Sequence, residues 1–195
     1  KLQEIIKKVE EKFLKTVKQH KLANKGDKIL ISCSGGPDSV LLAHLFNKFK
    51  NQIGAGILIV YFNHQLRGED SVREQGFVEN FASKIGIEIK SLKIKPKAGK
   101  GIGLEESARI IRYETLEKIA RAEKCSSVAL GHHLDDTVET VLFNMLRGSS
   151  VAGLKGIPVK RHMKFGGMII RPLLYVRKQE ILQYLGTVRI SFVED

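Results

Sequence analysis

The sequence predicts an α/β fold in which a parallel sheet of five strands carries helices on both faces. Short apolar runs of strand length alternate along the chain with longer segments whose apolar residues recur at helical spacing. Strands connected through helices run parallel, because each helix returns the chain to the same edge of the sheet. With 195 residues, the chain is long enough to bury a core around such a sheet without disulfides or metals.

The strands are predicted from apolar runs bounded by turn residues. An N-terminal helix over residues 2–20 precedes them, since its apolar side chains recur every three or four positions. The first strand, KILIS, follows the turn residues Gly26 and Asp27. In chain order, the strands are expected at Lys28–Ser32, Ala55–Phe62, Ile87–Ile94, Ser126–Leu130 and Met168–Ile170.

The helices are predicted between these strands, at Asp38–Lys50, Glu69–Ile85, Leu104–Glu123, Asp135–Arg147 and Arg177–Leu185. The segment Lys95–Gly103, rich in glycine and lysine, fits neither pattern and is expected to be a loop. In a Rossmann-like sheet of this kind, ligands bind beyond the carboxyl ends of the strands. A site is therefore expected after three of the strands, at Ser32–Ser39, Asn63–Arg67 and Gly131–Glu139.

Composition limits the class of protein. Hydrophobic residues make up 43% and charged residues 28%, which excludes a disordered chain. No apolar run reaches the roughly 18 residues of a membrane span, and the N-terminus has no apolar signal segment. The two cysteines are far apart in sequence, which fits a reducing compartment. We therefore expect one domain over residues 1–195, in the cytoplasm, with no membrane partner.

The formal net charge of +12 is concentrated in three stretches. Residues 1–28 hold nine lysines against four acidic residues, residues 87–102 hold five against one, and residues 155–182 hold seven lysines and arginines against one. Concentrated positive charge favours a polyanion such as nucleic acid. Lysine-rich faces can equally be solvated surface, and charge alone leaves the two interpretations open.

A glycine-rich loop follows the first strand, with the sequence Ser34-Gly35-Gly36-Pro37-Asp38-Ser39. Two glycines allow a tight turn and a close approach to an anion, and the helix that follows supplies free N–H groups. The two serine hydroxyls can donate to phosphate oxygens. The loop lacks the pattern of a Walker-type loop. The alternative is a plain strand-to-helix turn in which Asp38 or Ser39 caps the helix.

This loop resembles the PP-loop signature SGGxDS of the N-type ATP pyrophosphatases. Further strings appear in order along the chain: NHQLR at 63–67, ExxARxxRY at 105–113, GHHxDDxxET at 131–140, RGS at 147–149, GLxGI at 153–157 and RPLL at 171–174. Together they resemble the catalytic domain of the tRNA(Ile)-lysidine synthetase family. The resemblance implies a PP-loop ATPase fold (adenine nucleotide alpha hydrolase-like), without the C-terminal tRNA-binding domains of that family.

The resemblance also implies a reaction. The C2 oxygen of the wobble cytidine, in a tRNA(Ile) with a CAU anticodon, attacks the α-phosphate of ATP and releases pyrophosphate. The side-chain amine of free L-lysine then displaces AMP. ATP and Mg²⁺ are the expected cofactors, and a homodimer is possible.

Charged side chains are assigned to the site as follows. Asp38 is a candidate Mg²⁺ ligand or loop organiser. Arg109 and Arg112 lie three apart on one helix face and suit phosphate or a cytosine edge, although Arg109 could instead pair with Glu105. The resemblance assigns both arginines to the ATP and cytidine site.

Asp136 and Glu139 also lie three apart, so both carboxylates share a helix face. Asp136 is assigned to Mg²⁺ or to the lysine amine, and Glu139 to substrate orientation. The alternative is a helix capping box made by the same two residues.

The histidines and two further arginines have separate expected roles. His64 and His133 are expected to contact nucleotide, whereas His132 is expected to be buried with its polar atoms satisfied. Arg147 and Arg171 are candidate substrate contacts. The alternatives are a helix-terminal arginine at Arg147 and an ion pair between Arg171 and the C-terminal carboxylates.

Other functions fit the sequence less well. A tRNA-cytidine thiolase would need paired cysteines for an iron–sulfur cluster, which are lacking here. NAD and GMP synthetases share SGGxDS but fit GHHxDDxxET and RPLL poorly. A non-catalytic ATP-binding module would not explain the carboxylate pair, and a bare RNA-binding domain would not explain SGGPDS.

Overall fold

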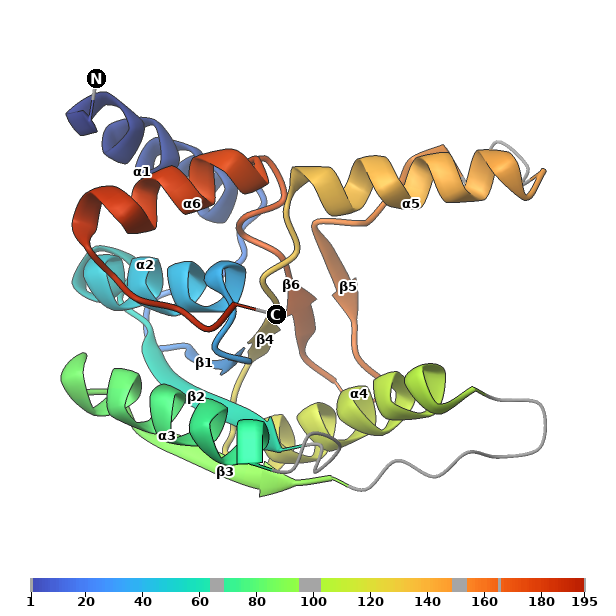
Figure 1. Cartoon of the computed structure of the whole chain (residues 1–195), viewed down its shortest axis with the longest axis horizontal. Helices are drawn as coiled ribbons and strands as arrows, with labels where there is room; N and C mark the ends of the chain where they lie inside the picture. Colours follow the sequence, from blue (N-terminus) through green and yellow to red (C-terminus); the bar gives the residue numbers. More distant parts are fainter. Residues whose placement is uncertain (1, 64–68, 95–102, 149–153, 165, 195) are drawn as a thin grey trace.

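The computed structural model describes residues 2–63, 69–94, 103–148, 154–164 and 166–194. Within them, six strands form one sheet in the order β3-β2-β1-β4-β6-β5 (Figure 1). All neighbouring pairs are parallel except β5–β6, which is antiparallel. In chain order the strands are β1 Lys28–Ser32, β2 Gly56–Asn63, β3 Ile89–Lys93, β4 Ser127–Ala129, β5 Lys160–His162 and β6 Met168–Ile170.

The prediction of five strands was wrong by one. The additional strand, β5, is a charged tripeptide, Lys160-Arg161-His162, whose three residues are all exposed. As an edge strand it pairs through its backbone with β6 alone, so its side chains follow no buried pattern. Apolar periodicity therefore could not detect it. The predicted loop at Lys95–Gly103 falls almost wholly outside the described residues.

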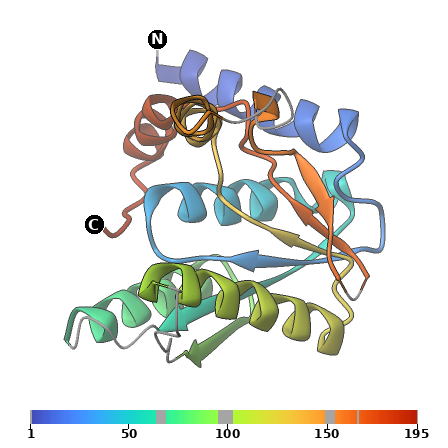
Figure 2. The ribbon, with the colours of Figure 1, turned by 90° about the vertical axis from the view of Figure 1, so that its right-hand side faces the viewer.

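Among the described residues, six α-helices connect or flank the strands, namely α1 Leu2–Gln19, α2 Pro37–Ile53, α3 Glu69–Lys84, α4 Leu104–Ala122, α5 Leu134–Leu146 and α6 Lys178–Val188. Alternate residues of the strands face opposite sides of the sheet and build two cores. Ile29 and Ile31 belong to the core shared with α1, α2, α3 and α6, whereas Leu30 belongs to the core shared with α4. Figure 2 shows α2 and α4 on opposite sides of β1. No described helix is long and apolar enough to cross a membrane.

Helix α1 is attached to α6 by a nearly buried carboxylate. Glu180 accepts hydrogen bonds from Lys12 at 2.7 and 2.9 Å and lies 2.9 Å from Lys8. Glu180 also accepts a hydrogen bond of 2.9 Å from the backbone N–H of Arg177, the N-cap residue of α6. Burial alone would raise the pKa of Glu180, but the Arg177 N–H and the two ammonium groups outweigh it and lower that pKa to about 2.

This pKa predicts a pH dependence of stability. A carboxyl whose pKa is depressed on folding stabilises the fold above its ordinary pKa of 4.5, and this contribution is lost as pH falls from 4.5 toward 2. We expect urea midpoints to fall over that range, and to fall less for Glu180→Gln. Glu11→Gln is the control, because Glu11 forms only an exposed pair with Lys7. Parallel curves for wild type and Glu180→Gln would contradict the prediction.

Candidate active site

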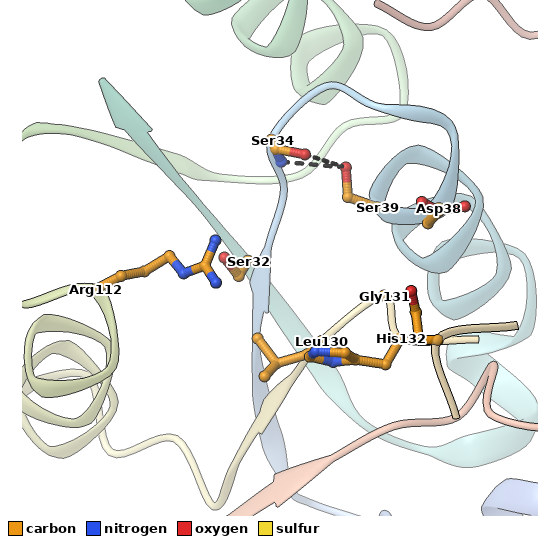
Figure 3. A pocket seen from close by; sticks show the side chains of 9 residues that line it. Ser32, Ser34, Asp38, Ser39, Arg112, Leu130, Gly131 and His132 are labelled. Atoms are coloured by element: carbon orange, nitrogen blue, oxygen red, sulfur yellow. Dashed lines mark hydrogen bonds between the residues drawn. The ribbon is translucent and has the colours of Figure 1, made fainter. Parts of the chain in front are cut away.

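A polar cavity of about 190 Å³ lies where the carboxyl ends of β1 and β4 meet the start of α2 (Figure 3). We call it the loop cavity. Its position follows from the topology, because β1 and β4 are parallel neighbours and their following loops leave the same edge of the sheet. It is lined by Ser32, Ser34, Asp38, Ser39, Arg112, Leu130, Gly131, His132 and Asp136.

The N-terminus of α2 is not capped by a side chain. Gly36 is its N-cap residue, with extended backbone and no side-chain cap hydrogen bond, and Pro37 occupies the first turn. The alternative that Asp38 or Ser39 caps the helix is therefore wrong. Backbone N–H groups at such a helix end, together with the helix dipole, favour an anion.

Ser39 holds the loop in shape. Its hydroxyl donates to the Gly36 carbonyl at 3.0 Å and accepts the Ser34 backbone N–H at 3.1 Å. The Ser39 side chain is buried and its proton is already used within the loop. Ser34 is therefore the better of the two serines for contact with a ligand.

Two glycines are required by close backbone approaches. Gly35 has a φ of +95°, and a Cβ there would lie 3.1 Å from Val78 and 3.2 Å from Val193. The Gly35 carbonyl also accepts the Val193 N–H at 2.9 Å, which joins the C-terminal segment to the loop. At Gly131, a Cβ would lie 3.1 Å from the carbonyl carbon of Asp38, so the segment that follows β4 closely approaches the first turn of α2.

Asp38 is paired with a lysine that the sequence did not single out. The Lys178 ammonium, at the start of α6, donates to both Asp38 carboxylate oxygens at 2.8 Å. The Lys178 backbone N–H donates to Asp135 at 2.8 Å. Lys178 thus connects α2, α5 and α6 beside the loop cavity. A separation of 140 positions, without a local pattern, hides such a pair from sequence reasoning.

Replacing Lys178 by Met is expected to weaken nucleotide binding. The Asp38 carboxylate would then face an anionic ligand without the neutralising Lys178 ammonium. Because the Lys178 and Asp38 side chains are both partly exposed, water screens the repulsion, and we expect a loss of about tenfold in ATP affinity. Lys178→Arg should retain most of the affinity. Titration of a fluorescent ATP analogue provides the measurement, and equal affinities for wild type and Lys178→Met would contradict the prediction.

His132 and His133 differ in their surroundings. His132 lines the loop cavity with a buried Nδ1 that has no hydrogen-bond partner. Burial, assisted by the Arg171 guanidinium, lowers the pKa of His132 to about 4, so its imidazole is neutral near pH 7. His133 is not among the residues lining the cavity. Its Nε2 lies 3.7 Å from Asp38, and its buried Nδ1 likewise has no hydrogen-bond partner. The expectation that the polar atoms of His132 are satisfied is therefore wrong for Nδ1. The nucleotide contact expected of His133 stays a prediction, and His132 becomes a further candidate because it lines the cavity.

Asp136 lies at the third position of α5, which begins at Leu134. Its Oδ2 accepts the His133 backbone N–H at 2.8 Å, so it satisfies the helix N-terminus while lining the loop cavity. The capping box that the sequence suggested, with Asp136 as the cap, is therefore not formed as expected. The second oxygen of Asp136 carries no hydrogen bond to the described residues, which leaves it for a ligand.

Comparison with known proteins identifies the family. The family model described as a PP-loop domain matches residues 5–195. The chain belongs to the PP-loop family. The resemblance seen in the sequence is confirmed at the level of this family. Because Ser34–Ser39 matches the signature SGGxDS, we call it the PP-loop from here on.

Three relatives carry related names. The chain is 37% identical over 191 residues to the tRNA(Ile)-lysidine synthase of Chlorobaculum tepidum, covering 96% of this chain and 56% of that protein. It is 39% identical to the tRNA(Ile)-lysidine synthase of Clostridioides difficile, covering 89% and 37%. It is 40% identical to the bifunctional protein TilS/HprT of Listeria monocytogenes, covering 95% and 29%. The chain thus spans between about a third and a half of the length of these relatives.

Solved structures support the same fold. The U34-tRNA thiolase NcsA of Methanococcus maripaludis, solved with its [4Fe-4S] cluster, superposes with a TM-score of 0.80 and 26% identity, covering 97% of this chain and 65% of that chain. An NH3-dependent NAD synthetase of Campylobacter jejuni superposes with a TM-score of 0.59 and 16% identity, covering 100% and 80%. The second likeness concerns the fold alone.

The predicted arginines Arg109, Arg112 and Arg171 have different surroundings. Arg112 reaches the loop cavity, with its guanidinium directed toward Ser32 (Figure 3). Arg109 does not line that cavity and instead donates to both oxygens of Glu106, at 2.7 and 2.8 Å. The side chain of Glu105, its expected alternative partner, is outside the described part. Arg171 is buried and donates to the Pro158 carbonyl at 2.8 Å rather than pairing with Glu194.

Two predicted residues on or at the end of α5, Glu139 and Arg147, are not among the residues that line the loop cavity. Glu139 is exposed on α5 and is not among the cavity residues. Arg147 ends the same helix, with its guanidinium 4.0 Å from the Phe143 ring centroid. His64 lies outside the described residues. The loop cavity therefore brings together five of the predicted residues, Ser34, Asp38, Ser39, Arg112 and Asp136, and it also contains His132.

Proposed function

We propose that this chain ligates L-lysine to C2 of the wobble cytidine of a tRNA(Ile) with a CAU anticodon, using ATP to activate the base. The observation that carries the proposal is the composition of the loop cavity. An uncapped helix N-terminus, the Ser34 hydroxyl and the Arg112 guanidinium share one space with the Asp136 carboxylate. This arrangement offers partners for a triphosphate beside a partner for an ammonium group. The names of the relatives support the tRNA and lysine as substrates.

The reaction has two steps. In the first, the cytidine C2 oxygen forms a bond to the α-phosphorus of ATP, the bond between the α- and β-phosphates breaks, and pyrophosphate leaves. In the second, the lysine side-chain nitrogen bonds to C2, the C2–oxygen bond breaks, and AMP leaves with that oxygen. One proton is lost from the amine. The protein must therefore stabilise a departing pyrophosphate and hold an amine that can lose its proton.

The residues divide between these tasks. The N-terminal amides of α2 and the Ser34 hydroxyl hold the pyrophosphate, and Arg112 balances charge on the reacting phosphate. Asp136 holds the lysine ammonium through the oxygen that the His133 N–H leaves unused. The neutral imidazole of His132 donates to or accepts from the nucleotide without adding charge. Glu139 and Arg147, which are both exposed, would meet the tRNA or the lysine from outside the loop cavity.

The residues present also fit Mg²⁺, which needs only one or two protein carboxylates when phosphates and water complete its shell. Asp136 has a carboxylate oxygen without a hydrogen bond to the described residues, and Asp38 becomes a second ligand if Lys178 moves from it. Bound there, Mg²⁺ would neutralise phosphate charge. The described residues hold no group of three or more candidate metal ligands, so the ion would depend on the nucleotide.

A thiolase function is the second candidate, because the NcsA structure superposes over nearly the whole chain. Its chemistry does not fit this chain. The two cysteines are both buried, and Cys33 and Cys125 belong to different cores on opposite faces of the sheet. They cannot together hold an iron–sulfur cluster.

The deciding experiment incubates the purified chain with ATP, labelled L-lysine and tRNA(Ile) bearing CAU. We expect label in the wobble nucleotide and release of pyrophosphate and AMP. A tRNA with a different wobble base is the control for position, and a reaction without lysine separates adenylation from ligation. ATP binding without pyrophosphate release would favour a passive nucleotide-binding module and contradict the proposal. A homodimer, also expected from the family resemblance, is tested by sedimentation of the same preparation.

A further inference from the structure

A second and larger cavity lies between helix α4 and the edge strand β5. Its volume is about 530 Å³, within the range of small-molecule sites. We call it the Tyr113 cavity. It shares no lining residue with the loop cavity. It is lined by Arg109, Ile110, Tyr113, Glu114, Glu117, Lys118, Arg161, His162 and Lys164.

The Tyr113 ring is surrounded by cationic groups. The guanidinium carbons of Arg161, Arg109 and Arg112 lie 4.9, 5.8 and 6.0 Å from its centroid. Buried Arg171 also interacts electrostatically with Tyr113. Burial lowers the pKa of Arg171, and the nearby Tyr113 hydroxyl opposes that effect.

This charge is only partly balanced within the protein. Arg109 is paired with Glu106, but Arg161 is exposed and makes no ion pair with the described residues. Lys164 is exposed at the same rim. Glu114 and Glu117 contribute two carboxylates to the wall, which suit hydrogen-bond donors such as the amino group of a base. Together these groups offer an aromatic face, exposed cations and carboxylate acceptors, which match a nucleotide better than a simple anion.

Arg112 connects the two cavities. Its side chain lines the loop cavity while its guanidinium carbon lies 6.0 Å from the centroid of the Tyr113 ring. The Arg112 side chain could therefore contact both a ligand in the Tyr113 cavity and the reacting phosphate in the loop cavity. Single-stranded RNA is commonly bound with bases splayed onto aromatic side chains and with phosphates on arginine or lysine.

We propose that the Tyr113 cavity binds an unstacked nucleotide of the substrate RNA next to the reacting cytidine. The base stacks on Tyr113, and the phosphate contacts Arg161 and Lys164. This inference rests on the proposed function, and it adds a subsite that orients the anticodon loop. Holding one neighbour of the cytidine limits the rotation of its backbone, which directs the reacting base into the loop cavity.

The test measures binding of a fluorescein-labelled CAU anticodon stem–loop by anisotropy, with the chain as it is. Tyr113→Leu keeps an apolar side chain of similar reach but removes the stacking face. It should weaken RNA binding by about 5- to 100-fold, whereas Tyr113→Phe should stay close to wild type. Arg161→Gln should lower the slope of log affinity against log salt by about 0.7 to 1.

Two controls make the result specific. Lys50→Gln removes one exposed charge at the end of α2 remote from the PP-loop, and should leave RNA affinity almost unchanged. ATP affinity should be unchanged in Tyr113→Leu, which shows that the loop cavity is intact. Equal RNA affinity of wild type and Tyr113→Leu, or no RNA binding by wild type, would overturn the subsite. Because binding is measured without lysine, failure of lysidine formation alone would count against the proposed function and not against the subsite.

Discussion

Asp136→Asn is expected to reduce lysine incorporation by at least about 100-fold while the protein remains folded. The asparagine side-chain oxygen can still accept the His133 backbone N–H, which Asp136 accepts at 2.8 Å, so the start of α5 keeps its hydrogen bond. What is lost is the negative charge in the loop cavity. The measurement is the single-turnover rate of lysine incorporation, accompanied by thermal unfolding to confirm the fold.

The step that fails identifies the role of Asp136. If it holds the lysine amine, pyrophosphate release should continue and only the second step should stall. Raising the pH should then restore part of the rate, because more lysine carries an unprotonated amine. If Asp136 instead serves Mg²⁺, both pyrophosphate release and ligation should be lost, and pH should not restore them.

Asp135→Asn is the matched control for this variant. Asp135 is the neighbouring carboxylate on α5 and accepts the Lys178 backbone N–H at 2.8 Å, a bond that asparagine can also accept. It is not among the residues lining the loop cavity. Comparable losses for Asp135→Asn and Asp136→Asn would mean that general negative charge at this helix end matters, and would contradict a specific role of Asp136.

The fold was predictable where burial on both sides of the sheet forces an apolar run. Strands β1 and β2 are of this kind, and their residues alternate between two cores. The edge strand β5 was missed because its three residues are exposed and their side chains do not pack into a core. Backbone pairing alone makes this segment a strand, and such pairing leaves no apolar pattern in the sequence. Sequence periodicity therefore predicts the centre of such a sheet better than its border.

The site was predictable where it is built from one continuous segment. The PP-loop carries its own glycines and serines, so a short string was enough to predict a loop between β1 and α2 that leads into an uncapped helix N-terminus. Contacts between distant segments were not predictable, as with Lys178 on Asp38. Which of the two adjacent histidines lines the loop cavity was likewise not predictable, because it depends on how the surrounding fold buries them: His132 lines the cavity, whereas His133 is buried outside its lining.

Gly35→Ala is expected to have the second large effect, lowering stability by about 2 to 3 kcal/mol and activity by about 100-fold. The residue has a φ of +95°, which an alanine adopts only with strain, and the new Cβ would lie 3.1 and 3.2 Å from the methyl groups of Val78 and Val193. Relief of these contacts must move the loop, and with it the amides that we propose hold the pyrophosphate. Thermal unfolding and pyrophosphate release measure the two consequences.

Gly26→Ala separates backbone strain from loop displacement. Gly26 has a similar φ of +88°, but nothing lies within 4 Å of a Cβ built there. It should lose about 1 to 2 kcal/mol of stability with unchanged turnover. Adding Val193→Ala to Gly35→Ala removes one of the two close contacts and should recover part of the activity, although the strain at φ remains. If Gly26→Ala lost as much activity as Gly35→Ala, the loss would follow from lower stability, and the role given to the loop amides would be wrong.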